Sequence, residues 1–81
     1  MHVPERDRYE LRLGDRVIGH AAYRRRGDRI AFTHTEVDSA CSGRGFGTKL
    51  VAEALDSARG ASLEVIPLCP FVADYVRRHP A

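Results

Sequence analysis

The stretch Ser42-Gly43-Arg44-Gly45-Phe46-Gly47 constrains the fold of this 81-residue chain more than any other. Its glycines stand at alternate positions and lead directly into a helical apolar pattern that includes Leu50. Such a loop gathers backbone N–H groups above a helix N-terminus, where the helix dipole favours an anion. The loop lacks the Gly-Lys-Ser/Thr ending of a Walker loop, and the chain is too short for a dinucleotide-binding fold. Two interpretations of the loop remain, a phosphate-binding site and a plain turn, and we favour the phosphate-binding site.

Composition narrows the class of protein. Thirteen Lys and Arg residues, twelve of them Arg, stand against eleven Asp and Glu, and this net charge of +2 is too small to indicate a polyanion-coating protein. Cys41 and Cys69 are too few for a disulfide framework and lack metal-ligand spacing, so we expect a reducing compartment and no metal site. No apolar run approaches a membrane span, and Met1 to Arg8 is charged. We therefore expect one cytoplasmic domain over residues 1–81, with no membrane contact.

Three strands are predicted before the glycine loop: Tyr9 to Leu13, Arg16 to Arg24, and Arg29 to Val37. Short turns with glycine separate them, which predicts antiparallel pairing. Gly19, inside the second strand, indicates a bulge or a close backbone approach. Strict alternation along the third strand places one set of four side chains on a common face, namely Ile30, Phe32, His34 and Glu36.

A helix, a strand and a second helix are predicted after the loop. The first helix runs from about Gly45 to Arg59 and has one apolar stripe, made of Leu50, Val51, Ala54, Leu55 and Ala58. Ser62 to Ile66 predicts a buried strand, parallel to the third strand because a helix joins them. Pro70 begins the last helix, with Cys69 at or beside its N-cap, and His79 ends it. The expected fold is α+β with a mixed sheet.

Two side chains are candidates for chemistry, and each has a structural alternative. Cys69 is either a buried core thiol or a thiol whose pKa is lowered by the N-terminus of a helix. His34 is either a hydrogen-bonded strand histidine or a base near neutral pH. Cys41 lies in a loop with no neighbouring feature that suggests activation, so it is assigned no role.

The loop followed by Thr48-Lys49-Leu50 resembles the acetyl-CoA pyrophosphate loop of the GNAT N-acetyltransferase superfamily, Arg/Gln-x-x-Gly-x-Gly/Ala, with Ser42 at its first position. The chain is most similar to the short, single-domain GNAT subfamily. That subfamily pairs a His-Thr-x-Val segment with a Pro-x-Cys-x-aromatic-Val segment, which stand here as His34 to Val37 and Pro67 to Val72. The resemblance extends from about Leu11 to the end of the chain.

This resemblance implies a minimal GNAT-like fold, in which the third and fourth strands splay apart around the pantetheine arm of acetyl-CoA. It implies catalytic roles for His34 and Cys69. It also implies that acetyl-CoA is bound by Val37, Ser42, Gly43, Arg44, Gly45, Phe46, Gly47, Thr48 and Lys49. The implied reaction is acetyl transfer to an amine, with His34 as general base and Cys69 either carrying an acetyl-thioester or assisting direct transfer. Tyr75 matches a tyrosine that broader members use as an acid, but its stripe position favours core packing.

Two other classes of function stay open. A chain without the additional helices and strands of larger GNAT enzymes is also suited to binding CoA as a non-catalytic sensor or accessory module. The hairpin Arg24-Arg25-Arg26 offers three cations without interleaved aromatic residues, a pattern more typical of a solvated turn than of a nucleic-acid site. Neither the acceptor amine nor the oligomeric state can be predicted from the sequence.

Overall fold

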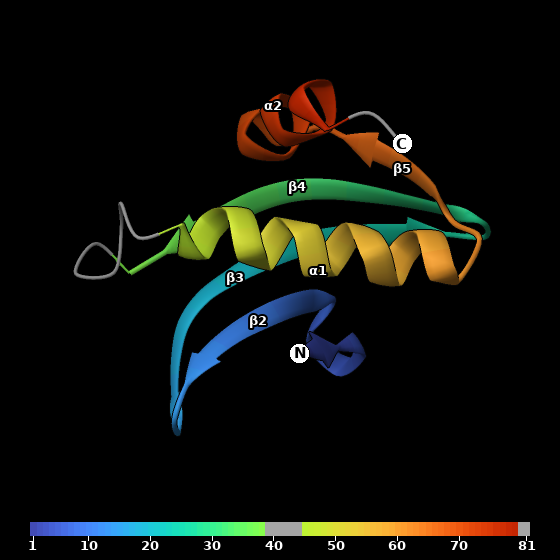
Figure 1. The fold of residues 1–81 in the computed structure, drawn as a ribbon. Helices are drawn as coiled ribbons and strands as arrows, with labels where there is room; N and C mark the ends of the chain where they lie inside the picture. Colours follow the sequence, from blue (N-terminus) through green and yellow to red (C-terminus); the bar gives the residue numbers. More distant parts are fainter. Residues whose placement is uncertain (39–44, 80–81) are drawn as a thin grey trace.

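Five strands and two α-helices are present in the computed structural model, which describes residues 1–38 and 45–79 (Figure 1). The α+β class with a mixed sheet is confirmed. The sheet is larger than expected by one short strand, because His2–Val3 pairs with the strand that follows it. The elements in chain order are β1 (His2–Val3), the 3-10 helix η1 (Pro4–Arg6), β2 (Arg8–Leu13), β3 (Arg16–Arg26), β4 (Arg29–Val37), α1 (Phe46–Gly60), β5 (Glu64–Pro67) and α2 (Pro70–Arg78).

The strands lie side by side in sequence order. Neighbours from β1 to β4 are antiparallel, and β5 is parallel to β4, as expected for two strands joined through a helix. The expected position of β4 is confirmed, and β3 extends to Arg26. The fourth predicted strand, Ser62 to Ile66, begins two residues and ends one residue too early, and it was expected to be buried. It is a half-buried edge strand on which Glu64 is exposed and pairs with Arg29 at 3.1 Å.

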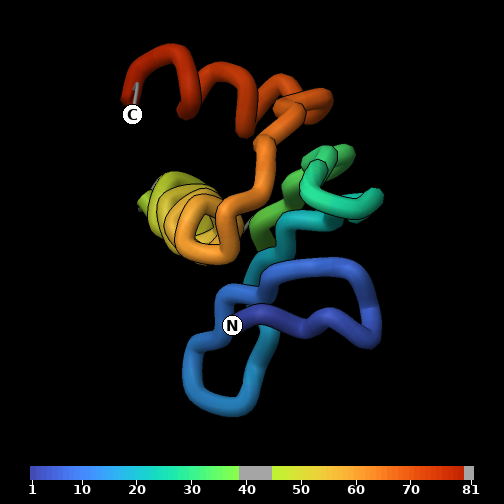
Figure 2. Tube along the Cα trace, turned by 90° about the vertical axis from the view of Figure 1, so that its right-hand side faces the viewer, coloured from blue at the N-terminus to red at the C-terminus, as the bar shows by residue number. Residues whose placement is uncertain are grey.

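Both helices lie against the same face of the sheet, α1 across its middle and α2 beside it at the β5 end (Figure 2). The predicted stripe of α1 is buried in full. Phe32 of β4 is completely buried, and its ring centroid lies 6.2 Å from those of Tyr9 and Tyr23. The opposite face, here called the open face, carries no α-helix among the described residues. No helix in these ranges is long and apolar enough to cross a membrane.

A bulge at Thr33 overturns the predicted faces of β4. Tyr23 pairs with Phe32 and Ala22 pairs with His34, so Thr33 is an extra residue in β4. The bulge restarts the alternation. Phe32 therefore faces α1, whereas the His34 and Glu36 side chains are 61% and 68% exposed. The strict alternation assumed from the sequence was wrong from Thr33 onward.

A second irregularity lies beside Gly19, as its position in the strand predicted. Leu11 pairs with Gly19 and Arg12 pairs with Val17, so the register shifts by one residue. A Cβ placed on Gly19 would lie 3.0 Å from the carbonyl oxygen of Glu36. That spacing is tighter than ordinary contact, so glycine permits the close approach of the two backbones.

Glu10 is a buried carboxylate on β2, only 3% exposed. Its carboxylate lies 2.6 Å from an Arg8 guanidinium nitrogen and 3.2 Å from one of Arg12. The hydrogen bond from Arg8 lowers the pKa of Glu10; burial opposes it, and Arg12 adds to the lowering. The backbone of Glu10 also holds the N-terminus, since its N–H donates to the Met1 carbonyl at 2.7 Å. This backbone hydrogen bond helps to hold the N-terminus against β2.

We expect Phe32→Ala to lower the free energy of unfolding by about 3–5 kcal/mol, because it leaves a cavity under α1. A chain of this size has about 4–12 kcal/mol in total, so the variant should be largely unfolded at 37 °C. Phe71→Ala is the matched control, since Phe71 is 44% exposed, and it should cost about 1 kcal/mol or less. Urea denaturation followed by circular dichroism measures both. Equal losses in the two variants would contradict the placement of Phe32.

Glu10→Gln tests the buried ion pairs through pH. A lowered pKa in the folded state stabilises the protein above the unfolded pKa of about 4.3, and this stabilisation is lost as pH falls through the folded pKa. The difference in unfolding free energy between wild type and Glu10→Gln should therefore be largest near neutral pH and shrink in acid. Urea denaturation at a series of pH values measures it. A difference that is independent of pH would contradict a charged Glu10.

Candidate active site

β4 and β5 run together over four residue pairs and then part. The pairing extends from Arg29 with Glu64 to Phe32 with Pro67. The N–H of Cys69 then donates to the Phe32 carbonyl at 2.8 Å, and the chain leaves the sheet to begin α2. β4 itself continues to Val37, with no further pairing to β5. An edge of this kind can accept an extended ligand as an additional strand.

Three elements converge at Gly47, in the first turn of α1. A Cβ on Gly47 would lie 2.8 Å from Cζ of Phe71 in α2 and 3.5 Å from Cγ2 of Val37 at the end of β4. A side chain larger than hydrogen would therefore displace the Phe71 ring. Gly45 is the N-cap of α1 and has φ of 77°, in the left-handed region that favours glycine. Gly45 is thus favoured by its backbone conformation, and Gly47 by the Phe71 ring that lies against it.

The beginning of α1 is electrostatically suited to an anion. The N–H groups of Phe46, Gly47 and Thr48 belong to the first turn, where an α-helix supplies no backbone acceptor. The first turn contains no acidic residue, Lys49 lies exposed beside it, and the N-cap residue, Gly45, has no side chain to cap the helix. The positive end of the helix dipole is therefore not offset locally. The predicted residues Ser42, Gly43 and Arg44 lie outside the described residues.

A pocket of about 80 Å³ lies between the start of α1 and α2. Thr48 lines it from α1, and Phe71 and Arg78 line it from α2. The Tyr75 and His79 rings, also at this pocket, stack with centroids 4.4 Å apart. Arg78 also forms an ion pair with Asp74, whose carboxylate lies 3.2 Å away. The pocket places a hydroxyl, a cation and aromatic surface within reach of the first turn of α1.

Cys69 is the N-cap of α2, as predicted, and is 5% exposed. Its Sγ lies 3.5 Å from the hydroxyl oxygen of Thr35. Burial alone would raise the pKa of the Cys69 thiol. The Thr35 hydroxyl and the backbone N–H groups of Val72 and Phe71 outweigh burial, and the net pKa is lowered. Cys69 is therefore buried and has a lowered pKa, so it combines one feature of each sequence interpretation.

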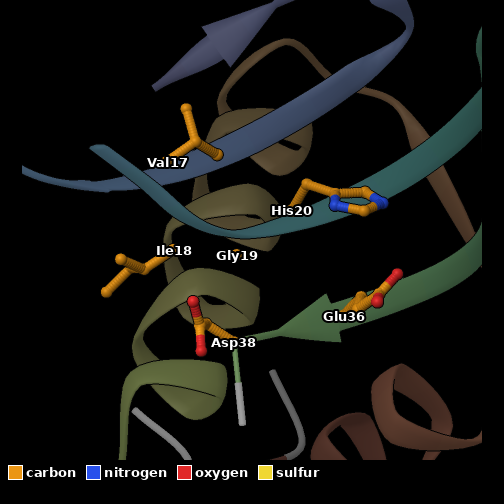
Figure 3. A pocket seen from close by; sticks show the side chains of 6 residues that line it. All are labelled: Val17, Ile18, Gly19, His20, Glu36 and Asp38. Carbon is orange, nitrogen blue, oxygen red and sulfur yellow. The ribbon is translucent and has the colours of Figure 1, made fainter. Parts of the chain in front are cut away.

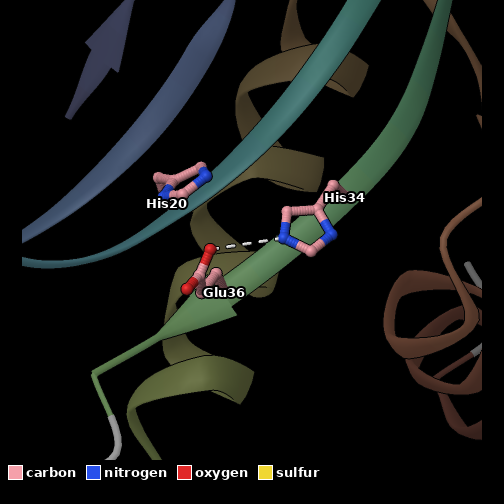
Figure 4. A group of neighbouring side chains, drawn as sticks. All are labelled: His20, His34 and Glu36. Carbon is pink, nitrogen blue, oxygen red and sulfur yellow. Dashed lines mark hydrogen bonds and ion pairs between the residues drawn. The ribbon is translucent and has the colours of Figure 1, made fainter.

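His34 is not brought together with Cys69. Thr35, whose side chain meets Cys69, follows His34 in the strand, and consecutive strand residues point to opposite faces. His34 lies on the open face, where its Nε2 is 3.4 Å from a carboxylate oxygen of Glu36 (Figure 4). The two candidates for catalysis therefore border the free edge of β4 from opposite sides of the sheet.

Sequence reasoning missed three residues of this region: Thr35, His20 and Glu36. Thr35 stands inside the quoted His-Thr-x-Val segment, so its position was available although its contact was not. His20 joins the region because it pairs directly with Glu36 across β3 and β4. Burial lowers the pKa of His20, and the nearby Arg8 cation adds to the lowering. No local sequence signal connects His20 to His34.

A groove of about 210 Å³ continues from these residues along the first part of β3. Val17, Gly19 and His20 line it from β3, and Glu36 and Asp38 line it from β4 and the residue after it (Figure 3). Arg16 forms a short ion pair with Asp38 at the same end of the sheet. The groove opens on His20 and Glu36, so solvent reaches both side chains.

The comparison with known families agrees with this geometry. The profile of a family described as GCN5-related N-acetyl-transferase matches residues 8–81. The chain therefore belongs to this GNAT family, and the resemblance identified from its motifs is confirmed. No curated protein has a sequence that matches the chain. Membership supports acetyl transfer in general and leaves the acceptor and the catalytic residues to be argued from the structure.

Thr35→Val tests the activation of Cys69. The substitution keeps the shape of the side chain and removes the hydroxyl, so we expect the pKa of Cys69 to rise. The test uses a Cys41→Ser background, in which Cys69 is the one remaining thiol, and follows thiolate absorbance against pH. Thr35→Ser keeps the hydroxyl and should leave the pKa near its wild-type value. An unchanged midpoint in Thr35→Val would show that Thr35 does not stabilise the thiolate.

Proposed function

We propose that the protein transfers the acetyl group of acetyl-CoA to the nitrogen of an amine. The observation that carries this proposal is that three features adjoin one another, because Val37 at the end of β4 and Phe71, two residues after Cys69, both lie against Gly47. The three features are the first turn of α1 at Gly47, the edge of β4 that β5 leaves free, and the activated thiol of Cys69. The family match supports the class of reaction.

Acetyl-CoA would be bound by residues at both ends of the free edge. Backbone N–H groups in the stretch from Arg44 to Thr48 would hold the pyrophosphate above α1, with Ser42 and Gly43 completing the loop. The Arg44 and Lys49 cations would lie near phosphate oxygens. Val37 lies at the end of β4 beside Gly47, where it would border the pantetheine arm. The arm would then run along β4 toward Cys69.

Cys69 would carry the acetyl group in the proposed reaction. Its thiolate attacks the thioester carbonyl carbon, the bond from that carbon to the CoA sulfur breaks, and CoA leaves as a thiolate. An unprotonated amine then attacks the acetyl-Cys69 thioester and releases the Cys69 thiolate. In the alternative, Cys69 assists direct attack of the amine on acetyl-CoA. Both versions need the acceptor to lose a proton, because a protonated amine has no lone pair.

His34 is the proposed base. It lies on the open face, whereas the helices cover the face that holds Cys69. An amine that approaches the free edge of β4 from the open face would pass His34 before it reaches the acetyl group. The exposed imidazole is accessible to such an acceptor, since 61% of the His34 side chain is in contact with solvent. Protons would therefore leave on one side of β4 and the acetyl group would arrive on the other.

A second candidate function is CoA binding without turnover, as a sensor or accessory module. The burial of Cys69, which is 5% exposed, favours this alternative, because a sensor has no need of a thiol that an acceptor can reach. Both functions use the same loop and the same free edge. They differ in whether acetyl-CoA loses its acetyl group.

Acetyl transfer is tested by mixing the protein with acetyl-CoA and a panel of amines: a polyamine, a lysine peptide and a peptide with a free N-terminus. Mass spectrometry should find one acetyl group on Cys69 before the amine is added and none afterwards. Cys69→Ala should abolish the adduct and lower kcat about 100-fold or more. His34→Gln should keep the adduct and lower kcat by about 100-fold or more, as loss of a general base does.

The controls separate the alternatives. Full activity of Cys69→Ala, with no adduct in wild type, would exclude the covalent route and leave direct transfer. Tight binding of CoA in calorimetry, with acetyl-CoA stable toward every amine in the panel, would favour the sensor. Arg25→Ala, near the β3–β4 turn and outside the proposed site, is the matched control and should leave kcat/KM unchanged.

A further inference from the structure

The open face of the sheet carries a cluster of metal-ligating side chains that the proposed acetyl transfer does not use as a unit. His20 lies on β3, and His34 and Glu36 lie on β4 (Figure 4). His20 and Glu36 are direct cross-strand partners, and His34 is two residues before Glu36 on the same face. Strand pairing between β3 and β4 thus places all three side chains together on the open face.

Their spacing fits a shared ion better than it fits a hydrogen bond. One ligand atom from each of His20, His34 and Glu36 lies within 4.8 Å of the other two. Nε2 of His34 is 3.4 Å from the Glu36 carboxylate, long for an N–H···O hydrogen bond, which prefers about 2.9–3.0 Å. Two ligands bound tetrahedrally to zinc at about 2.0–2.1 Å lie roughly 3.3–3.4 Å apart. Small rotations of exposed side chains would bring the remaining distances into that range.

We propose that His20, His34 and Glu36 bind one Zn²⁺ ion on the open face of the sheet. Two imidazoles and one carboxylate are a donor set typical of zinc, with a fourth position left for water. Two nitrogen donors disfavour Mg²⁺ and Ca²⁺, which prefer all-oxygen coordination. Cys69 is not one of the ligands, because its thiol meets Thr35 on the other face.

The surroundings allow an ion to enter. His34 and Glu36 are largely exposed, and the groove of Figure 3 opens on His20 and Glu36, so water can complete the coordination. His20 is half-buried, which limits its rotation. The Arg8 cation acts on His20, and its charge is offset by the Glu10 carboxylate at 2.6 Å. Among the contacts described, no Lys or Arg side chain lies within hydrogen-bond distance of the Glu36 carboxylate. The carboxylate is therefore available to a zinc ion.

Zinc binding and the proposed base role of His34 use the same side chain. An imidazole that binds zinc through one nitrogen carries its proton on the other, so it has no lone pair left to accept a proton. The loaded site and a His34 base are therefore alternative states. Zinc binding is measured without acetyl-CoA, so its failure is distinguishable from failure of the proposed acetyl transfer.

The test uses the full chain without an affinity tag, because a histidine tag would bind zinc itself. Calorimetric titration should give one zinc per chain with a dissociation constant in the micromolar range. His20→Gln, His34→Gln and Glu36→Gln should each weaken binding by about 10-fold or more, because each removes one of three ligands. His79→Gln and Glu64→Gln, which remove exposed residues outside the cluster, should leave the affinity within about twofold of wild type.

Two further measurements keep the proposal falsifiable if a variant is destabilised. Circular dichroism verifies that each variant is folded, and saturating zinc should raise the melting temperature of wild type but not of Glu36→Gln. Cobalt added in place of zinc should give visible absorption typical of nitrogen and oxygen ligands, without a thiolate charge-transfer band. No binding at millimolar zinc, equal loss in His79→Gln, or loss in Cys69→Ser with an intact trio would overturn the proposal and leave a His34–Glu36 ion pair alone.

Discussion

The parting of β4 from β5 at Phe32 is the constraint on which the proposed site depends. Pro67 is the last residue of β5 to pair, and proline has no N–H to continue a ladder. Instead, the N–H of Cys69 donates a hydrogen bond to the carbonyl of Phe32. The chain then leaves the sheet, and Cys69 is the N-cap of α2. The same turn leaves the end of β4 without pairing to β5 and sets the thiol beside Thr35. One short segment thus creates the free edge and positions the sulfur next to it.

The sequence predicted the helices better than the sheet, for a physical reason. The five buried residues of α1 follow from a single local period, and Pro70 after Cys69 marks the start of α2 without reference to any other element. A strand's faces depend on its partners as well as on its own residues. The extra residue at Thr33 is visible only in the pairing of β3 with β4, and nothing in the local composition of β4 marks it. The short strand β1 likewise depends on a partner, because the N–H of Glu10 in β2 donates a hydrogen bond to the carbonyl of Met1.

The same distinction divides the candidate site. Gly45, Gly47 and Cys69 were found from local signals, since a left-handed N-cap, a close approach and a helix cap each leave a mark on neighbouring residues. The group on the open face could not be found in this way. His20 and His34 are fourteen positions apart, and only the register that sets His20 opposite Glu36 brings them together. Motif spacing along the chain contains no trace of that register, which is why the sequence did not group these three residues.

The bulge at Thr33 has one further consequence for the chemistry of β4. Strict alternation from Phe32 would place His34 on the helix-covered face, beside the thiol, and would turn Thr35 to solvent. With the bulge, Thr35 stabilises the thiolate, and His34 joins His20 and Glu36 on the open face. A histidine beside Cys69 would act on the sulfur directly. A histidine on the open face is separated from it by the strand, so it can serve an acceptor amine or a metal ion but not deprotonate the thiol. The activation of Cys69 therefore has to come from Thr35 and the start of α2.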